Sequence, residues 1–235
     1  MNRVPRLLLD SLPAAGGEVR LEASASHHLL RVLRAAVGQE LELLDGRGGR
    51  AAARLESADR QVRLSCQAPR QAAEPDLKLE AWLPLIRPER LEWAVEKLTE
   101  LGIWRIVPYS SARSGNQKRP PDLARLGRII DAALEQSGNP WRPGLAPPAS
   151  LAALLDGELP LLAALPVADS RLGAALDRPH GTLALLAGPE GGFSAEEIEL
   201  VMKRSLALVS LGPHVVRAET ALVTLTGVVQ ALTNN

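Results

Sequence analysis

The chain has 235 residues, of which 46% are hydrophobic, and its formal net charge at pH 7 is zero. That length provides for one large domain or two modest domains with an apolar core, and we expect two. The balanced charge argues against a protein that coats nucleic acid indiscriminately, because that mode of binding needs a large excess of lysine and arginine. The single cysteine, Cys66, excludes a disulfide framework and cysteine-based zinc sites, and we expect it to be a small buried hydrophobe.

The apolar runs of the chain are short. None approaches the ~18 residues of a membrane span, and the first ten residues lack the apolar run of a signal peptide. We therefore expect a soluble, cytoplasmic protein without a membrane partner. Residues 1–70 carry eleven arginines and eight acidic residues, so the front of the chain is mildly basic. Because the arginine fork suits phosphate, this part could hold RNA, although an ordinary solvated surface explains the same composition.

The first seventy residues predict a small β-barrel with one helix. Apolar residues alternate or cluster between glycine-bearing turns. The strands are expected at residues 18–22, 40–44, 50–55 and 61–65. The helix is expected at residues 27–36, with Ser26 as its N-cap and Gly38 ending the turn. The proline-bracketed stretch 68–75 predicts a linker between two domains, residues 1–70 and 76–235.

Strands and helices alternate after the linker, which is typical of an α/β domain. The strands are expected at residues 79–86, 103–109, 159–165, 182–187 and 206–211. The helices are expected at residues 88–101, 123–137 and 219–232, with a further one after the capping box that begins at Ser194.

Two glycine-bearing loops stand at the ends of neighbouring predicted strands. They are Gly188-Pro189-Glu190-Gly191-Gly192 and Leu211-Gly212-Pro213-His214. Open α/β sheets bind ligands at such strand ends, and glycine lets the backbone approach a flat ring closely. The loops therefore favour an adenosyl ligand, although a tight strand-to-helix turn would have the same sequence.

Most standard chemistries lack their motif in this chain. We find no phosphate loop, no dinucleotide-binding glycine fingerprint after the first strand, no nucleophile elbow and no His-Glu-x-x-His helix. His27 and His28 are adjacent, so on a helix they diverge by about 100° and cannot chelate together. We expect no metal site.

Six motifs in order carry a resemblance that spans nearly the whole chain. They are His27-His28-Leu29-Leu30-Arg31-Val32-Leu33-Arg34, Arg87-Pro88-Glu89-Arg90-Leu91-Glu92-Trp93, Lys97-Leu98-Thr99-Glu100-Leu101-Gly102, Glu135-Gln136-Ser137-Gly138, Gly188-Pro189-Glu190-Gly191-Gly192 and Arg217-Ala218-Glu219-Thr220-Ala221. With them the chain closely resembles the bacterial 16S ribosomal RNA uridine-N3 methyltransferases of the SPOUT superfamily. The resemblance implies an α/β fold, with an N-terminal PUA-like β-barrel and a C-terminal SPOUT domain that contains a deep trefoil knot. It also implies a homodimer that takes S-adenosylmethionine, releases S-adenosylhomocysteine, and methylates N3 of uridine 1498 in the 16S rRNA of the small subunit, with no role for DNA.

The resemblance also assigns roles to individual residues. Arg217 is the candidate for stabilising the deprotonated uracil, and Glu219 is the weaker candidate for proton acceptor, because with Thr220 it could simply cap the last helix. The residues expected to hold the cofactor are Leu165, Gly188, Pro189, Gly192, Leu211, Gly212, Val216, Thr220 and Ala221. The residues expected to contact RNA are Arg31, Arg34, Arg87, Arg90, Arg113 and Arg142.

Some positions depart from the family pattern. Asn139 and Trp141 stand where relatives commonly have arginine, which puts RNA contacts there in doubt, and Ala112 stands where glutamate is common. Arg87 replaces a usual lysine and Ala218 a frequent threonine. Two alternatives remain open: a knotted methyltransferase for another RNA site or a ribose 2′-hydroxyl, and a ribosome-assembly factor that binds RNA without catalysis.

Overall fold

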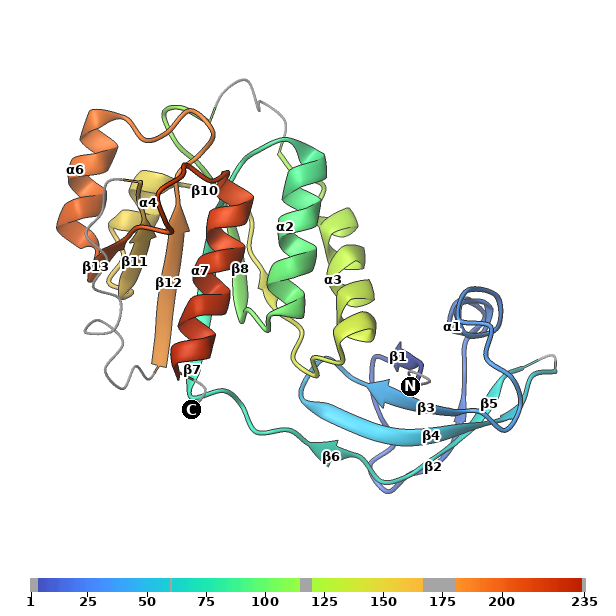
Figure 1. Cartoon of the computed structure of the whole chain (residues 1–235). Helices are drawn as coiled ribbons and strands as arrows, with labels where there is room; N and C mark the ends of the chain where they lie inside the picture. Colours follow the sequence, from blue (N-terminus) through green and yellow to red (C-terminus); the bar gives the residue numbers. More distant parts are fainter. Residues whose placement is uncertain (1–3, 60, 115–119, 167–180, 234–235) are drawn as a thin grey trace. The chain divides into compact units, whose positions relative to one another are not determined.

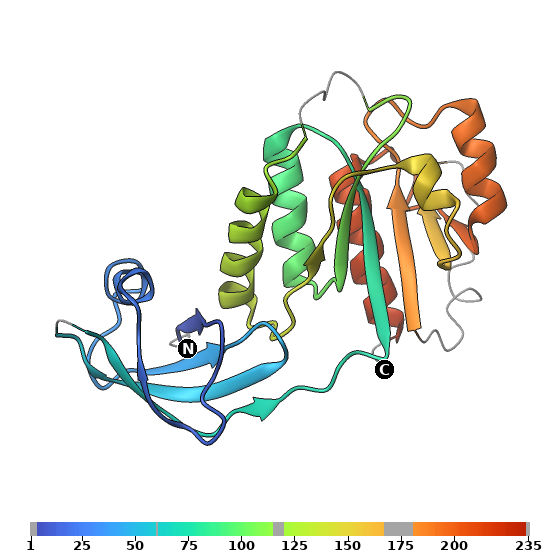
Figure 2. The ribbon, with the colours of Figure 1, turned by 180° about the vertical axis from the view of Figure 1, so that it is seen from behind.

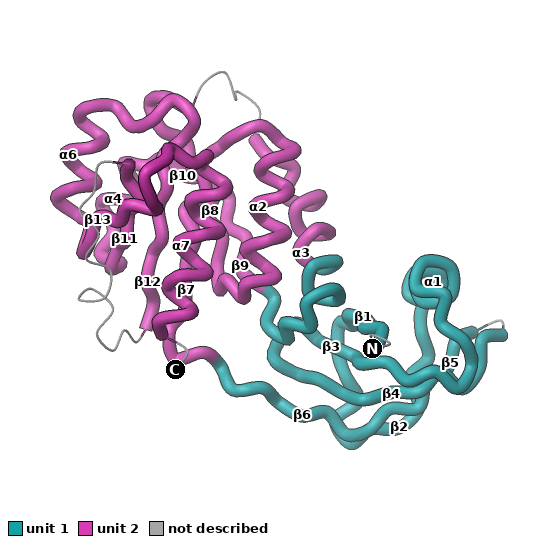
Figure 3. The backbone as a smooth tube through the Cα atoms, viewed as in Figure 1, with its two compact units in different colours: residues 1–74, 131–142 teal, residues 75–130, 143–235 magenta. Residues whose placement is uncertain are grey.

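The computed structural model describes residues 4–59, 61–114, 120–166 and 181–233. The chain divides into two compact units (Figure 3). Unit 1 comprises residues 1–74 and 131–142, and unit 2 comprises residues 75–130 and 143–235. The sequence did not indicate that residues 131–142 belong with the amino-terminal unit. No helix in the described ranges is both long and apolar enough to cross a membrane.

A six-stranded sheet forms most of unit 1 (Figure 1). Its strands are β1 (Arg6–Leu8), β2 (Gly17–Arg20), β3 (Glu40–Leu44), β4 (Gly49–Ser57), β5 (Arg63–Cys66) and β6 (Arg70–Gln71). The order is β1-β3-β4-β5-β2 with β6 beside β4, and only the pair β1 and β3 is parallel. Buried and exposed residues alternate along β4 because one face of the sheet covers a core that includes Leu43, Leu55 and Leu64.

The helical segment of unit 1 differs from the expected single helix at residues 27–36. It begins earlier, as α1 (Ala23–His27), and continues as a π-helix, η1 (His28–Val32). Ser26 is not the N-cap: it lies inside α1, and its hydroxyl donates to the carbonyl of Leu21. The apolar spacing predicts one regular amphipathic helix, but only Leu29 of η1 is buried, while Val32 is 60% exposed.

Unit 2 is built on a parallel seven-stranded sheet. Its strands are β7 (Leu77–Pro84), β8 (Arg105–Ser110), β9 (Gly144–Leu145), β10 (Ala149–Ser150), β11 (Leu161–Ala164), β12 (Gly181–Ala187) and β13 (Ala207–Val209). The order is β10-β8-β7-β12-β11-β13, with β9 beside β8, and every pair is parallel. Such sheets are covered on both faces, which explains why β12 is apolar and buried from Leu183 onward.

Helices cover the sheet of unit 2. They are α2 (Pro88–Glu100), α4 (Leu151–Leu155), α6 (Ala195–Arg204) and α7 (Ala218–Thr233). The boundary between the two units falls within a further helix, α3 (Leu123–Ser137). On one face, α7 packs against α2, β7 and β12 (Figure 1), and the view from behind shows the strands in front of α2 and α7 (Figure 2). α4 and α6 contact each other and bury Leu151, Leu155 and Val201 in a second core.

Candidate functional site

Three strand ends meet at one edge of the parallel sheet in unit 2. Strands β12, β11 and β13 are neighbours and run in the same direction, so the segments that follow Ala187, Ala164 and Val209 lie at the same edge. We call residues 188–194 the glycine loop and residues 210–217 the second loop. Together with parts of α2, α6 and α7 they enclose a pocket of about 650 Å³.

Most of the residues predicted to hold a cofactor line this pocket. Those that do are Leu165, Gly188, Pro189, Gly192, Leu211, Gly212, Val216 and Ala221. Arg217 also lines it. Thr220 does not: it is exposed on the first turn of α7. The sequence therefore located the pocket, although it did not foresee the contribution of α6, from which Ile198 and Met202 join the wall.

Glycine is required in both loops by the backbone conformation. Gly192 has φ of +70° and Gly212 has φ of +117°, values that side chains with a Cβ rarely adopt. The glycine loop then enters α6 through a capping box, in which the amide of Glu197 donates to Ser194 Oγ and the amide of Ser194 donates to Glu197 Oε2. The predicted capping box is therefore confirmed.

The end of β8 and the turn that follows it support the glycine loop. The hydroxyl of Tyr109 donates to the carbonyl of Ala187, the last residue of β12, at 2.6 Å. Burial raises the pKa of Tyr109, with the charge of Glu197 adding to the effect, so the phenol stays protonated and able to donate. The amide of Ala112 donates to Glu197 Oε1, and a Cβ on Gly191 would lie 2.9 Å from the carbonyl oxygen of Arg113.

Sequence reasoning missed this support. The one available signal was that Tyr109, the single tyrosine of the chain, ends a predicted strand. Buried tyrosines usually find a hydrogen-bond partner, so a partner at a neighbouring strand end could have been sought.

Charged side chains gather at one side of the pocket. Arg90, on the first turn of α2, forms ion pairs with Glu190 of the glycine loop and with Glu219 of α7, the latter with 3.8 Å between Nε and Oε1. Glu219 is only 5% exposed, and its Oε2 is buried without a hydrogen-bond partner in the described chain. Arg217 is exposed, and no ion pair with another described residue holds it.

The arginines predicted to contact RNA are distributed over both units. Arg31 and Arg34 are exposed on and just after η1, and Arg34 has a positive φ of 53°, which is uncommon for a residue other than glycine. Arg142 also belongs to unit 1, where it is paired with Asp131. Arg87, Arg90 and Arg113 belong to unit 2, and of these Arg90 lines the pocket.

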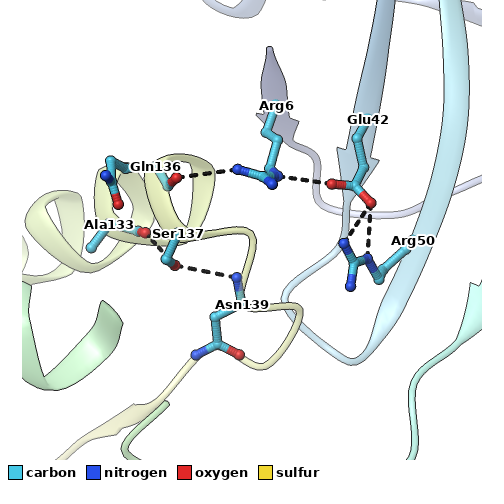
Figure 4. Close-up of polar contacts among 7 residues, drawn as sticks. All are labelled: Arg6, Glu42, Arg50, Ala133, Gln136, Ser137 and Asn139. Atoms are coloured by element: carbon cyan, nitrogen blue, oxygen red, sulfur yellow. Dashed lines mark hydrogen bonds and ion pairs between the residues drawn. The ribbon is translucent and has the colours of Figure 1, made fainter. Parts of the chain in front are cut away.

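The motif Glu135-Gln136-Ser137-Gly138 stands at the end of α3 and lies in unit 1. Figure 4 shows two of its residues, Gln136 and Ser137. Arg6 joins it to the sheet, because its guanidinium donates to the carbonyl of Gln136 and to Glu42 Oε2. Gly138 has φ of +79°, and a Cβ there would lie 2.6 Å from that guanidinium. The motif thus packs the end of α3 against β1 and β3, a structural task that the sequence did not reveal.

Glu135 of the same motif faces η1. Its Oε1 accepts the amide of Leu8, and its Oε2 lies 3.1 Å from His28 Nε2 without the alignment of a hydrogen bond. Burial raises the pKa of Glu135 and outweighs the opposing effects of that amide and of His28. No group of three or more His, Cys, Asp or Glu side chains in the described ranges could hold a metal ion.

Comparison with known proteins gives consistent results for both halves of the chain. Residues 73–230 match an RNA methyltransferase domain and residues 21–64 match an RNA methyltransferase PUA domain. The ribosomal RNA small subunit methyltransferase E of Synechocystis is 30% identical over 86% of this chain and 69% of its own length. That of Rickettsia conorii is 27% identical over 93% and 92%. A crystal structure of a ribosomal RNA small subunit methyltransferase E from Neisseria gonorrhoeae bound to S-adenosyl methionine superposes with a TM-score of 0.82, at 26% identity over 98% of each chain.

Proposed function

The chain belongs to the RNA methyltransferases, in the family of ribosomal RNA small subunit methyltransferase E, and we propose that it methylates N3 of uridine 1498 in 16S rRNA with S-adenosylmethionine as donor. The observation that supports this most directly is the pocket at the ends of β11, β12 and β13, where eight residues expected to hold the donor come together. Ribosomal subunits are cytoplasmic, so we place the activity there.

The residues of the pocket fit such a donor. Its volume of about 650 Å³ falls in the usual range for small-molecule sites, ~300–1,000 Å³. Leu165, Leu211 and Val216 offer apolar contact to a flat ring, and the loop glycines allow the backbone to approach its edge closely. The related enzyme from Neisseria gonorrhoeae was crystallised with S-adenosyl methionine, which favours the same ligand here.

We propose that Arg217 stabilises the deprotonated uracil ring during methyl transfer. When bound, the donor supplies an electrophilic methyl group on a sulfonium sulfur. Uridine N3 must lose its proton as the N3–carbon bond forms and the sulfur–carbon bond breaks, and the negative charge of the ring spreads onto two carbonyl oxygens. A guanidinium at the pocket stabilises that charge. Arg217 suits the role because it lines the pocket and is not neutralised by a carboxylate of the described chain.

Glu219 is the proposed acceptor of the N3 proton. It follows Arg217 by two residues, and its buried Oε2 accepts no hydrogen bond from a described residue. We propose that this oxygen accepts the proton from the base, either directly or through a relaying water. The same carboxylate lies in the first turn of α7, where it also interacts favourably with the helix dipole.

Binding of rRNA is proposed to involve both units. Unit 1 carries the PUA match and the exposed Arg31 and Arg34, and unit 2 carries Arg87 and Arg113. We also propose that unit 2 is threaded as a deep trefoil knot around the pocket, that unit 1 closes as a PUA-like barrel, and that the enzyme works as a homodimer, as its resemblance to the SPOUT superfamily implies.

The experiment that tests this function is transfer of a labelled methyl group to small subunits lacking the modification, followed by nucleoside analysis. We expect label in 3-methyluridine and none in 2′-O-methylated nucleosides. Label in a ribose-methylated product would establish the other enzyme class. Absence of transfer to both naked 16S rRNA and assembled subunits, with subunit binding intact, would indicate an assembly factor without catalysis.

A further inference from the structure

Arg90 connects three elements that meet at the pocket. It starts from the first turn of α2, and its guanidinium is paired with Glu190 of the glycine loop and Glu219 of α7. Its side chain is 26% exposed and lines the pocket beside both loops. A planar guanidinium with several donors can hold two carboxylates in a fixed relation, whereas a side chain with one point charge cannot do so as rigidly.

Glu219 needs this contact more than Glu190 does. The side chain of Glu219 is 7% exposed, against 42% for that of Glu190, and Oε2 of Glu219 has no hydrogen-bond donor among the described residues. A buried carboxylate is costly unless a cation compensates it, and Arg90 is the one cation of the described chain within ion-pair distance. Loss of Arg90 would leave this buried carboxylate without a compensating charge, and a movement of Glu219 toward solvent would displace the first turn of α7.

That turn is part of the pocket wall. Ala218 and Ala221 flank Glu219 in α7, and both line the pocket, as does Arg217 immediately before the helix. Glu190 stands between Pro189 and Gly192, which line it from the glycine loop. The ion pairs of Arg90 therefore fix two walls of the same pocket relative to each other.

The same pairs make Arg90 a poor ligand for RNA phosphate. Two carboxylates more than offset its single positive charge, so little attraction remains for an anion. Arg87, three residues earlier, is exposed and has no ion pair in the described chain, which leaves its charge available.

We infer that Arg90 is a positioning residue of the donor pocket: through Glu190 and Glu219 it holds the glycine loop and the start of α7 in the geometry that binds the donor. This inference rests on the proposed function, because it takes the pocket to be the donor site. It removes Arg90 from the set of RNA ligands suggested by sequence and adds it to the pocket.

Calorimetry with S-adenosylmethionine and the full-length protein tests the inference. We expect Arg90→Gln to raise the Kd for the donor by about tenfold or more, since a partly buried charge pair is broken, and Arg90→Lys to recover part of that loss. Arg125→Gln is the matched control, because Arg125 is exposed on α3 and forms its ion pair with Glu92, which does not line the pocket, so the change should leave the donor Kd unchanged.

Subunit binding at several salt concentrations separates the two roles of arginine. Arg87→Gln should weaken subunit binding and reduce its salt slope by about one, without affecting the donor Kd. Arg90→Gln should leave that slope as in the wild type. If Arg90→Gln instead lowers the salt slope and keeps the donor Kd within about twofold of wild type, the residue is a phosphate ligand and the inference is wrong.

A double-variant cycle keeps the test decisive if Arg90→Gln folds poorly. Adding Glu219→Gln to it removes the uncompensated buried charge, so the double variant should fold, and its donor Kd should exceed that of the single variant Glu219→Gln by much less than tenfold. A tenfold or larger difference between these two variants would show that Arg90 acts independently of Glu219. Failure of the wild type to bind the donor would refute the proposed function itself, whereas normal wild-type binding with an unaffected Arg90→Gln variant would refute the present inference alone.

Discussion

Arg217 and Arg90 both line the pocket, but their charges are in opposite situations. Arg90 is held between two carboxylates, while Arg217 is exposed and free of ion pairs in the described chain. An arginine whose charge is uncompensated can stabilise negative charge on a substrate, and one that is already neutralised can hold structure. We therefore propose that Arg217 serves the chemistry and Arg90 the positioning of the pocket walls.

Arg217→Ala should separate binding from turnover. We expect the donor Kd to change little, because the donor is held largely by backbone and apolar groups, and kcat to fall by about 10²–10³-fold, because stabilisation of the uracil anion is lost. Calorimetry and single-turnover methyl transfer measure the two quantities. Unchanged turnover would remove Arg217 from the mechanism.

The carboxylate of Glu42, bonded to two arginines, should make the stability of unit 1 depend on pH. Burial raises its pKa, but hydrogen bonds from Arg6 and Arg50 outweigh that effect, so the folded-state pKa lies below the usual 4.5. A carboxyl with a depressed pKa stabilises the fold above its unfolded-state pKa, and this contribution is lost as the pH falls through the folded-state value.

Glu42→Gln should therefore lower the free energy of unfolding by about 1 kcal/mol at pH 7. The difference from wild type should shrink as the pH falls below about 4.5. Urea unfolding monitored across this range gives the measurement. Glu40→Gln, an exposed change in the same strand, is the control and should have little effect. A deficit for Glu42→Gln that is the same at all pH values would contradict the assignment to the ionised carboxylate.

At the scale of elements, Tyr109 ties the end of β12 to β8. Tyr109→Phe should lower the free energy of unfolding by about 1–2 kcal/mol, because the carbonyl of Ala187 loses a buried donor. It should also weaken donor binding severalfold, because that carbonyl immediately precedes the glycine loop. Thr226→Val removes a buried hydroxyl that bonds within α7 and is the control: it should lower stability without changing the donor Kd. Equal donor affinities for Tyr109→Phe and wild type would mean that the glycine loop keeps its conformation without this hydrogen bond.

The capping box of α6 offers a second test at this scale. Ser194→Ala removes the side chain that accepts the amide of Glu197, and we expect a loss of about 1 kcal/mol in unfolding free energy. Ser24→Ala, at an exposed position of α1, should cost much less. Denaturant unfolding of the two variants measures the difference, and similar values would show that the cap contributes nothing.

Local sequence signals predicted the regular elements well. The bounds of α3 and β3 coincide with the expected ranges, and the capping box of α6 and the positive φ of Gly102 after α2 follow directly from local chemistry. The π-helix η1 could not be predicted, because its apolar spacing is also that of an ordinary helix. Sequence could locate the two loops of the pocket for the same local reasons, but not the hydrogen bond from Tyr109 or the charge pairs of Arg90, which join residues 78 or more positions apart.

At the scale of the whole molecule, the division into units depends on contacts that no local pattern encodes. Residues 131–142 belong to unit 1 because Arg6 and Leu8 form hydrogen bonds with Gln136 and Glu135 at the end of α3. Composition suggested one linker and two consecutive domains, since only the proline-bracketed stretch departs from its surroundings. The sequence resemblance nevertheless identified the family, because motifs that follow one another in the correct order can be recognised without knowing which residues are in contact.

The measurement that tests the central claim most directly is base-resolved mapping of 16S rRNA from a strain deleted for this gene and complemented with wild type or with Arg217→Ala. A methyl group on N3 blocks the pairing edge of uracil and stops reverse transcription, whereas a ribose methyl does not block that edge. We predict a stop at uridine 1498 with wild type, and its loss in the deletion strain and with the variant. A stop that persists in the deletion strain, or a wild-type signal at another nucleotide, would contradict the account.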